Sequence, residues 1–208
     1  MSEEKPGLLV LTSTILLALF FWFVTFHLTW NIFWIKISCS AALLTMLSLA
    51  FEAAILKRIR FSPKGFLTGL LSAVLLYLMF WSAKTLSTKM FPFAAHQITG
   101  IYQKGMGMPL WLVALILFFV TAPFEEIYWR GFLQHNLMKR YGPWQGWILS
   151  TSIYVGVHIW SFNLMLIGAA AVAGAYWGLM YLRLKNLAPV IISHSLWSVF
   201  IFSIVPLR

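Results

Sequence analysis

The sequence has 208 residues, of which 61% are hydrophobic and 10% are charged, and its formal net charge is +10. Because soluble domains are about 45–50% apolar, this composition excludes an ordinary soluble domain and predicts an all-α domain that crosses a membrane several times. The apolar runs do not alternate with polar residues, which argues against a β-barrel. Lys and Arg beside anionic lipid explain the positive charge, so no nucleic-acid partner is expected.

Apolar segments of about 20 residues predict a polytopic transmembrane bundle of about seven to eight helices. The predicted spans are residues 7–26, 31–56, 64–86, 109–140, 143–160, 163–184 and 188–206. The polar stretch at residues 87–108 is long for a connection without a function, and we expect a re-entrant segment, an interfacial helix or a lid there. One membrane domain would then contain N-terminal helices and their loop at residues 1–108 and a core at residues 109–208.

Lys and Arg near the ends of the spans predict the orientation of the chain, because they are enriched in cytoplasmic loops. One side carries nine of them: Lys5, Lys57, Arg58, Arg60, Lys64, Lys139, Arg140, Arg183 and Lys185. The other side carries four: Lys84, Lys89, Lys104 and Arg208. We therefore expect a cytoplasmic N-terminus and a location in the inner membrane of a bacterium.

Two adjacent carboxylates, Glu125 and Glu126, follow a charge-free apolar run at residues 109–120. Ionisable groups at membrane depth are costly, usually paired and functional. Glu126 and Arg130 are four residues apart, so they share a helix face and can form an ion pair. Glu125 points about 100° away from Glu126 around the helix, which leaves it free to face a cavity as a general base.

Two histidines in later spans, His158 and His194, are the other candidate catalytic side chains. Either could polarise a water, donate to an oxyanion or bind a metal. Tyr154 precedes His158 by one helical turn and Ser198 follows His194 by one, so each can support its histidine.

Other polar or small residues are expected to have structural roles. A surface ion pair with Lys57 or Arg58 explains Glu52. Helix–helix hydrogen bonds or interfacial exposure explain the remaining histidines, which are His27, His96 and His135. Close helix packing explains the glycines of the sixth span, Gly168, Gly174 and Gly178. The single cysteine, Cys39, excludes an internal disulfide.

Three motifs together resemble the CPBP family of intramembrane proteases, which includes CAAX prenyl endopeptidases and bacteriocin-processing and abortive-infection proteins. The Glu-Glu-x-x-x-Arg signature corresponds to Glu125-Glu-Ile-Tyr-Trp-Arg130, followed by the usual glycine. The Phe-x-x-x-His signature corresponds to Tyr154-Val-Gly-Val-His158, and His-x-x-x-Asn or Asp to His194-Ser-Leu-Trp-Ser198. The resemblance covers roughly residues 109–206.

The resemblance implies a helical bundle with a polar cavity inside the membrane. Glu125 and His158 would activate a water that attacks a peptide carbonyl, and His194 and Ser198 would lie near the oxyanion. The remaining motif residues, Glu126 and Arg130, would shape the site. The chain departs from the pattern at two positions, with Tyr154 in place of Phe and Ser198 in place of Asn. A serine offers one hydroxyl where asparagine offers an amide donor and an acceptor.

The family also implies a choice between a metal-free glutamate mechanism and a metalloprotease. Zinc or another divalent metal would be held by Glu125, His158 and His194. We favour no cofactor, because there is no His-Glu-x-x-His motif and the cationic Arg130 near the site disfavours a second cation.

The predicted activity is therefore an intramembrane endopeptidase acting on a membrane-associated peptide or protein, such as a pheromone or bacteriocin precursor or a sorting signal. One alternative is a non-catalytic immunity or scaffold protein with the same fold, which Ser198 favours. Another is a small transporter, although no inverted repeat is evident.

Overall fold

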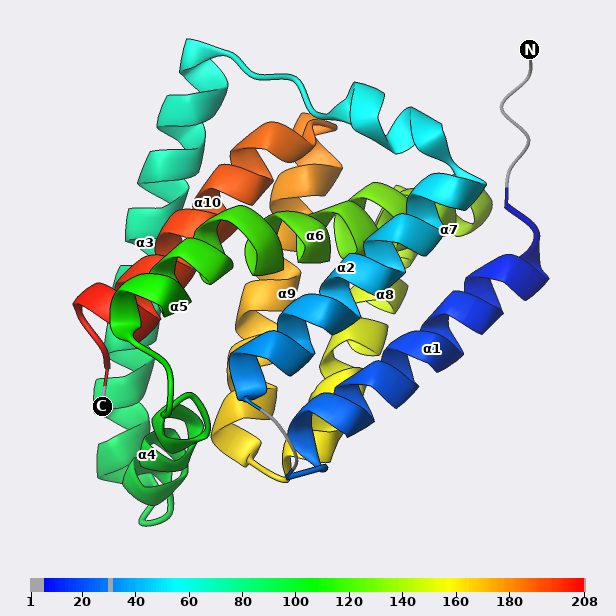
Figure 1. The fold of residues 1–208 in the computed structure, drawn as a ribbon. Helices are drawn as coiled ribbons and strands as arrows, with labels where there is room; N and C mark the ends of the chain where they lie inside the picture. Colours follow the sequence, from blue (N-terminus) through cyan, green and yellow to red (C-terminus); the bar gives the residue numbers. More distant parts are fainter. Residues whose placement is uncertain (1–5, 30–31, 208) are drawn as a thin grey trace.

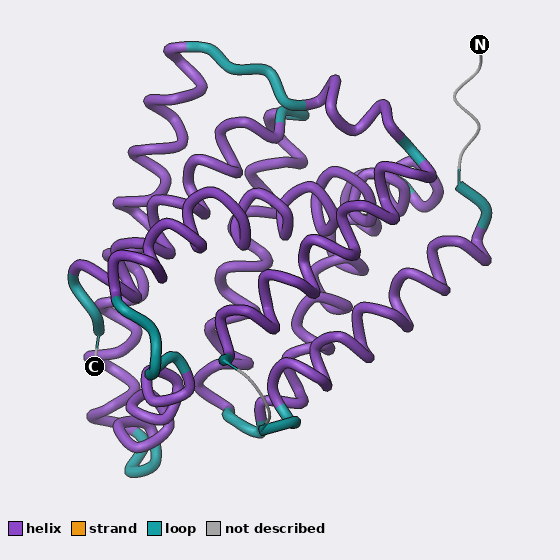
Figure 2. Tube along the Cα trace, viewed as in Figure 1, coloured by secondary structure: helices purple, strands orange, loops and turns teal. Residues whose placement is uncertain are grey.

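The computed structural model describes residues 6–29 and 32–207, and that part of the chain contains helices and connecting loops without strands (Figures 1 and 2). Trp30, at the predicted turn between the first two spans, and Asn31, the first residue of the predicted second span, lie outside the described residues. The helices are α1 (Leu8–Phe26), α2 (Phe33–Phe51), α3 (Pro63–Met90), α4 (Ala94–Lys104), α5 (Leu110–Ile116), α6 (Ala122–Glu126), α7 (His135–Tyr141), α8 (Pro143–Val157), α9 (Leu164–Leu184) and α10 (Leu187–Val199). The all-α polytopic fold is confirmed.

Six helices in the described part are long and apolar enough to cross a membrane. They are Leu8–Phe26, Phe33–Phe51, Pro63–Met90, Leu110–Tyr141, Leu164–Leu184 and Leu187–Ile204. The predicted span at residues 143–160 is shorter than expected, because α8 has 15 residues and ends in a 3-10 turn, His158–Ser161. At 1.5 Å per residue it is about 22 Å long. The chain is an integral membrane protein in which α8 packs between α7 and α9.

The polar stretch at residues 87–108 contains one short helix, α4, after a longer α3 than predicted. In Figure 1, α4 lies at the lower end of the bundle, where it packs against α9. Many apolar side chains of α3, such as Leu67, Leu71 and Leu75, are exposed, as expected for contact with lipid. Its opposite face packs closely on α10, where Ser72 and Ser193 hydroxyls are 2.9 Å apart.

The helix from Leu110 to Tyr141 is central to the bundle and changes its hydrogen bonding twice. The segments Leu117–Thr121 and Ile127–Gln134 are π-helical, and the short helix α6 with the carboxylate pair lies between them. Such π-helical turns are rare in proteins, and those that occur are often found at functional sites. Side chains from other helices bind carbonyls of both π-helical segments: Ser195 Oγ donates to Phe118 O at 3.0 Å and Arg58 Nη1 to Gly131 O at 2.8 Å.

Buried aromatic rings hold this helix against its neighbours. The largest fully buried side chains include Trp22, Trp129, Trp177, Tyr128, Tyr181 and Phe132. Trp22 of α1 meets Trp129 edge-on at 5.5 Å between centroids, and the Tyr128 hydroxyl donates to Thr14 O of α1 at 3.0 Å. The helix with the carboxylate pair is therefore fixed by α1 as well as by α2 and α10.

Candidate active site

Glu126 is completely buried and is held by two basic side chains. Arg130 Nη1 donates to Glu126 Oε1 at 2.8 Å, as their i, i+4 spacing predicts, and His194 Nδ1 lies 2.7 Å from the same oxygen. Because a carboxylate paired with arginine only accepts hydrogen bonds, Nδ1 of His194 is the donor. The Nε2 atom is then the ring nitrogen that is left for a ligand.

Arg130 is buried within a cage of aromatic rings and a backbone carbonyl. Its guanidinium carbon lies 4.8 Å from the ring centroid of Tyr154 and 5.7 Å from that of Trp177, and Nη2 donates to Gly174 O at 3.2 Å. Cation–π contacts of this kind favour a desolvated guanidinium. The ion pair is therefore enclosed on all these sides and can position His194 without contact with solvent.

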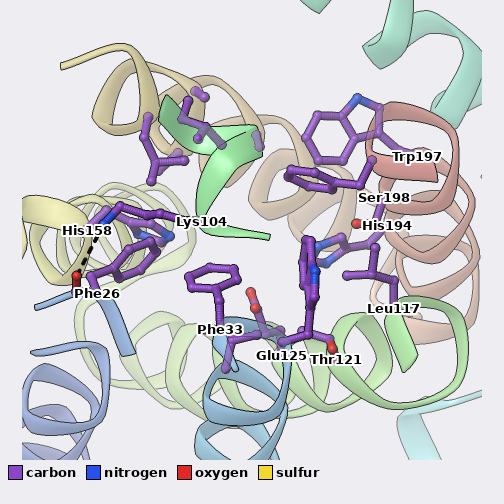
Figure 3. Close-up of a pocket in the computed structure, with 18 of the residues that line it drawn as sticks. Phe26, Phe33, Lys104, Leu117, Thr121, Glu125, His158, His194, Trp197 and Ser198 are labelled. Carbon is purple, nitrogen blue, oxygen red and sulfur yellow. Dashed lines mark hydrogen bonds between the residues drawn. The ribbon is translucent and has the colours of Figure 1, made fainter. Parts of the chain in front are cut away.

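Glu125 faces a cavity of about 120 Å³ in the middle of the bundle (Figure 3). The cavity lining includes four of the predicted site residues, which are Glu125, His158, His194 and Ser198. These side chains come from α6, the end of α8, and α10. A space of this size holds several waters, so an attacking water and part of a substrate have room beside the carboxylate. Glu126 and Arg130 lie behind the cavity wall.

Tyr154 connects two of the cavity residues. Its hydroxyl donates to Glu125 Oε2 at 3.3 Å, and its backbone carbonyl accepts from His158 Nδ1 at 2.7 Å. Trp22 Nε1 donates to His158 Nε2 at 3.4 Å. These two contacts assign the proton of His158 to Nδ1 and leave Nε2 as an acceptor. Glu125 therefore presents acceptor atoms to the cavity, whereas the single lone pair of His158 Nε2 accepts from Trp22.

Two tryptophans that support the histidines were not identified from the sequence. Trp22 lies on α1, in the part of the chain without motifs. Trp177 of α9 stacks on His194 with 3.8 Å between centroids, and its Nε1 donates to Ser193 Oγ at 3.1 Å. No spacing pattern distinguishes these from the other tryptophans, since the chain has 11 of them.

Gly174 of α9 has a role beyond the helix packing predicted for it. A Cβ atom at this position would lie 2.8 Å from Cδ1 of Tyr154. The missing side chain therefore makes room for the Tyr154 ring, while the Gly174 carbonyl binds Arg130. Gly168, by contrast, would have no neighbour within 4 Å of an added Cβ.

The residues predicted to be structural lie outside the cavity. The predicted pairing of Glu52 with Arg58 is confirmed, but the pair is not on the surface: the Glu52 side chain is 9% exposed, and Asn136 Nδ2 also donates to it at 2.7 Å. The predictions for the three remaining histidines are confirmed. His27 and His96 are exposed, and His135 Nδ1 lies 3.0 Å from the Tyr181 hydroxyl.

A metal ion in the cavity would need donor atoms from Glu125, His158 and His194, the alternative set that the resemblance implies. Among the described residues, no group of three or more His, Cys, Asp and Glu side chains could hold a metal ion. The three side chains of the alternative set line the same cavity, and Nε2 of His158, the nitrogen that would face a metal, accepts from Trp22 Nε1 at 3.4 Å.

Comparison with known proteins identifies one family. Residues 107–200 match the family model described as "Type II CAAX prenyl endopeptidase Rce1-like". The matched region is a little under half of the chain, contains all six residues predicted for the site and agrees with the family that the three motifs indicate. No curated protein and no solved structure gives a significant match to the chain.

Proposed function

Residues 107–200 match the type II CAAX prenyl endopeptidase Rce1-like family, and from that premise we propose that the chain is a metal-free intramembrane endopeptidase with Glu125 as its general base. The observation that carries the proposal is the cavity itself, which Glu125, His158 and His194 line together. Residues 109–208 contain the reacting groups. The preceding helices contribute Trp22, which contacts His158, and part of the cavity wall.

The first step is activation of a water between Glu125 and His158. The water takes the place of Trp22 Nε1, which lies 3.4 Å from Nε2 of His158, as the donor to that nitrogen. It donates its other hydrogen to the Glu125 carboxylate and directs a lone pair at the peptide carbonyl. The Tyr154 hydroxyl fixes the orientation of Glu125, and the backbone carbonyl of Tyr154 fixes the tautomer of His158. Glu125 takes the proton as the water attacks, and general base catalysis of this kind contributes about 10²–10⁴-fold in rate.

The second step is stabilisation of the tetrahedral intermediate and departure of the amine. His194, held at Nδ1 by Glu126, donates from a protonated Nε2 to the oxyanion, and Ser198 supplies a hydroxyl beside it (Figure 3). The Glu125 carboxyl then gives its proton to the leaving nitrogen as the carbon–nitrogen bond breaks. The products are a new carboxylate and a new amine, and Glu125 is returned to its starting state.

The proposal is tested by cleavage in proteoliposomes that contain the full chain. The probes are labelled peptides with an apolar anchor, in matched pairs with and without a farnesylated cysteine near the C-terminus. We expect cleavage by the wild type, loss of cleavage in Glu125→Gln, and no inhibition by a chelator. Cleavage that stops with the chelator and returns with added zinc would overturn the metal-free mechanism. Unchanged cleavage by Glu125→Gln would overturn the assignment of the base.

A non-catalytic scaffold is the second candidate function, because Ser198 stands where the family has Asn. It is distinguished in the same assay by Ser198→Asn. If the wild type cleaves no probe and Ser198→Asn cleaves, the natural chain is a scaffold with an otherwise intact site.

A further inference from the structure

The two ends of the helical bundle differ in charge. The end formed by residues 52–64, the end of α7 and the turn from α9 to α10 carries eight of the described Lys and Arg residues, and we call it the basic end. They are Lys57, Arg58, Arg60, Lys64, Lys139, Arg140, Arg183 and Lys185. Arg60 bonds to Lys185 O and Asn186, so these loops are in contact. Figure 1 shows them along the upper edge of the bundle.

The opposite end carries fewer cations, all of them lysines. Among the described residues they are Lys36, Lys84, Lys89 and Lys104. Lys5 and Arg208, which also entered the predicted charge bias, lie outside the described residues. Arg140 Nη2 donates to Pro6 O at 3.3 Å, which places the start of α1 at the basic end.

The cavity opens at the end opposite the basic end. Several lining residues lie at helix termini there: Phe26 ends α1, Phe33 begins α2, and His158 follows α8. Lys104, the last residue of α4, lines the cavity and is also exposed to solvent. The cavity therefore reaches the surface of the bundle beside Lys104.

Buried side chains close the route from the cavity to the basic end. One to two turns beyond Glu126, Phe132 and Leu133 are fully buried and Gln134 is 1% exposed. Ile55 and Leu187 are also fully buried and pack against Gly131, where an added Cβ would lie 2.8 Å and 2.9 Å from their side chains. A peptide cannot reach Glu125 from the basic end without displacing this layer.

We propose that the cavity opens on the extracytoplasmic side of the membrane and that its substrate is a peptide segment already exposed on that side. Lys and Arg are enriched in cytoplasmic loops, so the basic end faces the cytoplasm and the mouth beside Lys104 faces away from it. The side of the mouth follows from charge and geometry alone, whereas the statement about substrate rests on the proposed endopeptidase function. A cytoplasmic prenylated protein would be on the wrong side of the membrane for this site.

The test is the accessibility of single cysteines in the full chain. Cys39→Ser removes the natural thiol, and Lys104→Cys and Lys57→Cys then place one thiol at the mouth or at the basic end. Both lysines are exposed and both substitutions are the same, so each variant is the control of the other. A membrane-impermeant maleimide is applied to right-side-out and to inside-out membrane vesicles.

We expect Lys104→Cys to react in right-side-out vesicles and to lose labelling in inside-out vesicles, with the reverse for Lys57→Cys. The proposal would be overturned if Lys104→Cys reacted only in inside-out vesicles, or equally in both kinds of vesicle. The labelling result does not depend on activity, so it stands or fails separately from the proposed function.

In a second experiment, the anchored peptide probes are added from one side of the membrane only. Cleavage confined to probes added from the cytoplasmic side would overturn the inferred substrate class while leaving the endopeptidase assignment intact.

Discussion

Nδ1 of His194 lies 2.7 Å from Oε1 of Glu126, across helices that are 68 residues apart in sequence. The same oxygen accepts Arg130 Nη1 at 2.8 Å, so one buried carboxylate fixes both a cation and an imidazole. The two glutamates of the motif therefore differ in surroundings although they are adjacent. Glu126 is enclosed and positions His194, whereas Glu125 lines the cavity and is available to react.

The first prediction concerns Glu125→Gln. The amide keeps the size of the side chain and can still accept from Tyr154, but it cannot take a proton from water. We expect kcat to fall by at least about 10²-fold, with little loss of thermal stability because a buried charge is removed. The measurements are kcat with the peptide probes in proteoliposomes and Tm in detergent.

Glu52→Gln is the matched control for this variant. Among the described residues, Glu52 is the glutamate that lies outside the motif. Its carboxylate binds Arg58 and Asn136 away from the cavity. We expect its Tm to fall and its kcat to stay within about twofold of wild type at a temperature where both are folded, since exchanging a remote side chain leaves the transition-state contacts intact. Equal losses of kcat in the two variants would contradict a chemical role for Glu125.

The second prediction concerns Arg130→Lys. An ammonium group has no planar fork, so it cannot bind Glu126 and Gly174 O together as the guanidinium does. Disrupting one partner of a buried ion pair typically costs about 3–5 kcal/mol. We expect a loss toward the lower end of that range, since the charge is retained, measured by denaturant titration in micelles. An unchanged unfolding midpoint would show that the buried pair does not stabilise the fold.

The sequence predicted the helices whose existence depends on the length of an apolar segment. It did not predict the places where a helix ends because of local backbone geometry. Six long helices correspond to predicted spans because lipid requires about 20 apolar residues of a spanning helix. The early end of α8 was not predictable, because residues 143–160 carry no Asp, Glu, Lys or Arg and apolar residues continue past Val157 to Ile159 and Trp160. The chain turns at Phe162, which has a left-handed φ of 49°, and a phenylalanine gives no sequence signal for that conformation.

The candidate site was recognisable for a related reason. Ionisable side chains are so few in the later spans that Glu125, Glu126, Arg130, His158 and His194 are conspicuous, and the cavity and its buried wall bring them together. Apolar and aromatic partners carry no such signal. Neither Trp22 nor the burial of Glu52 could be inferred, because each depends on a contact with a residue 136 or 84 positions away.

The third prediction concerns Tyr154→Phe, which supplies the residue usual in the family. The variant keeps the ring over Arg130 and the carbonyl that binds His158, and it loses only the hydroxyl that donates to Glu125 at 3.3 Å. A hydrogen bond to a charged group contributes about 1.5–3 kcal/mol, and this long one belongs at the lower end. We expect kcat to fall about tenfold with KM unchanged, because the hydroxyl orients the base.

Tyr176→Phe is the control for the loss of a hydroxyl. Tyr176 donates to Ser72 O at 3.2 Å and does not line the cavity. The Tyr176→Phe variant should therefore have the kcat of the wild type. If Tyr154→Phe is as active as the control, Glu125 is oriented by the helix alone and the tyrosine is a packing residue.

The fourth prediction concerns Ser198, which lines the cavity one turn after His194. An asparagine places an N–H donor farther into the cavity than a hydroxyl does, and the cavity of about 120 Å³ has room for it. Removal of one oxyanion donor typically lowers kcat by about 10²–10³-fold. We expect Ser198→Asn to raise kcat and Ser198→Ala to lower it. Ser195→Ala should instead lower Tm, because Ser195 binds Phe118 O in the core. Equal kcat in wild type, Ser198→Ala and Ser198→Asn would mean that position 198 does not contact the oxyanion, and His194 would then be the only side chain assigned to stabilise it.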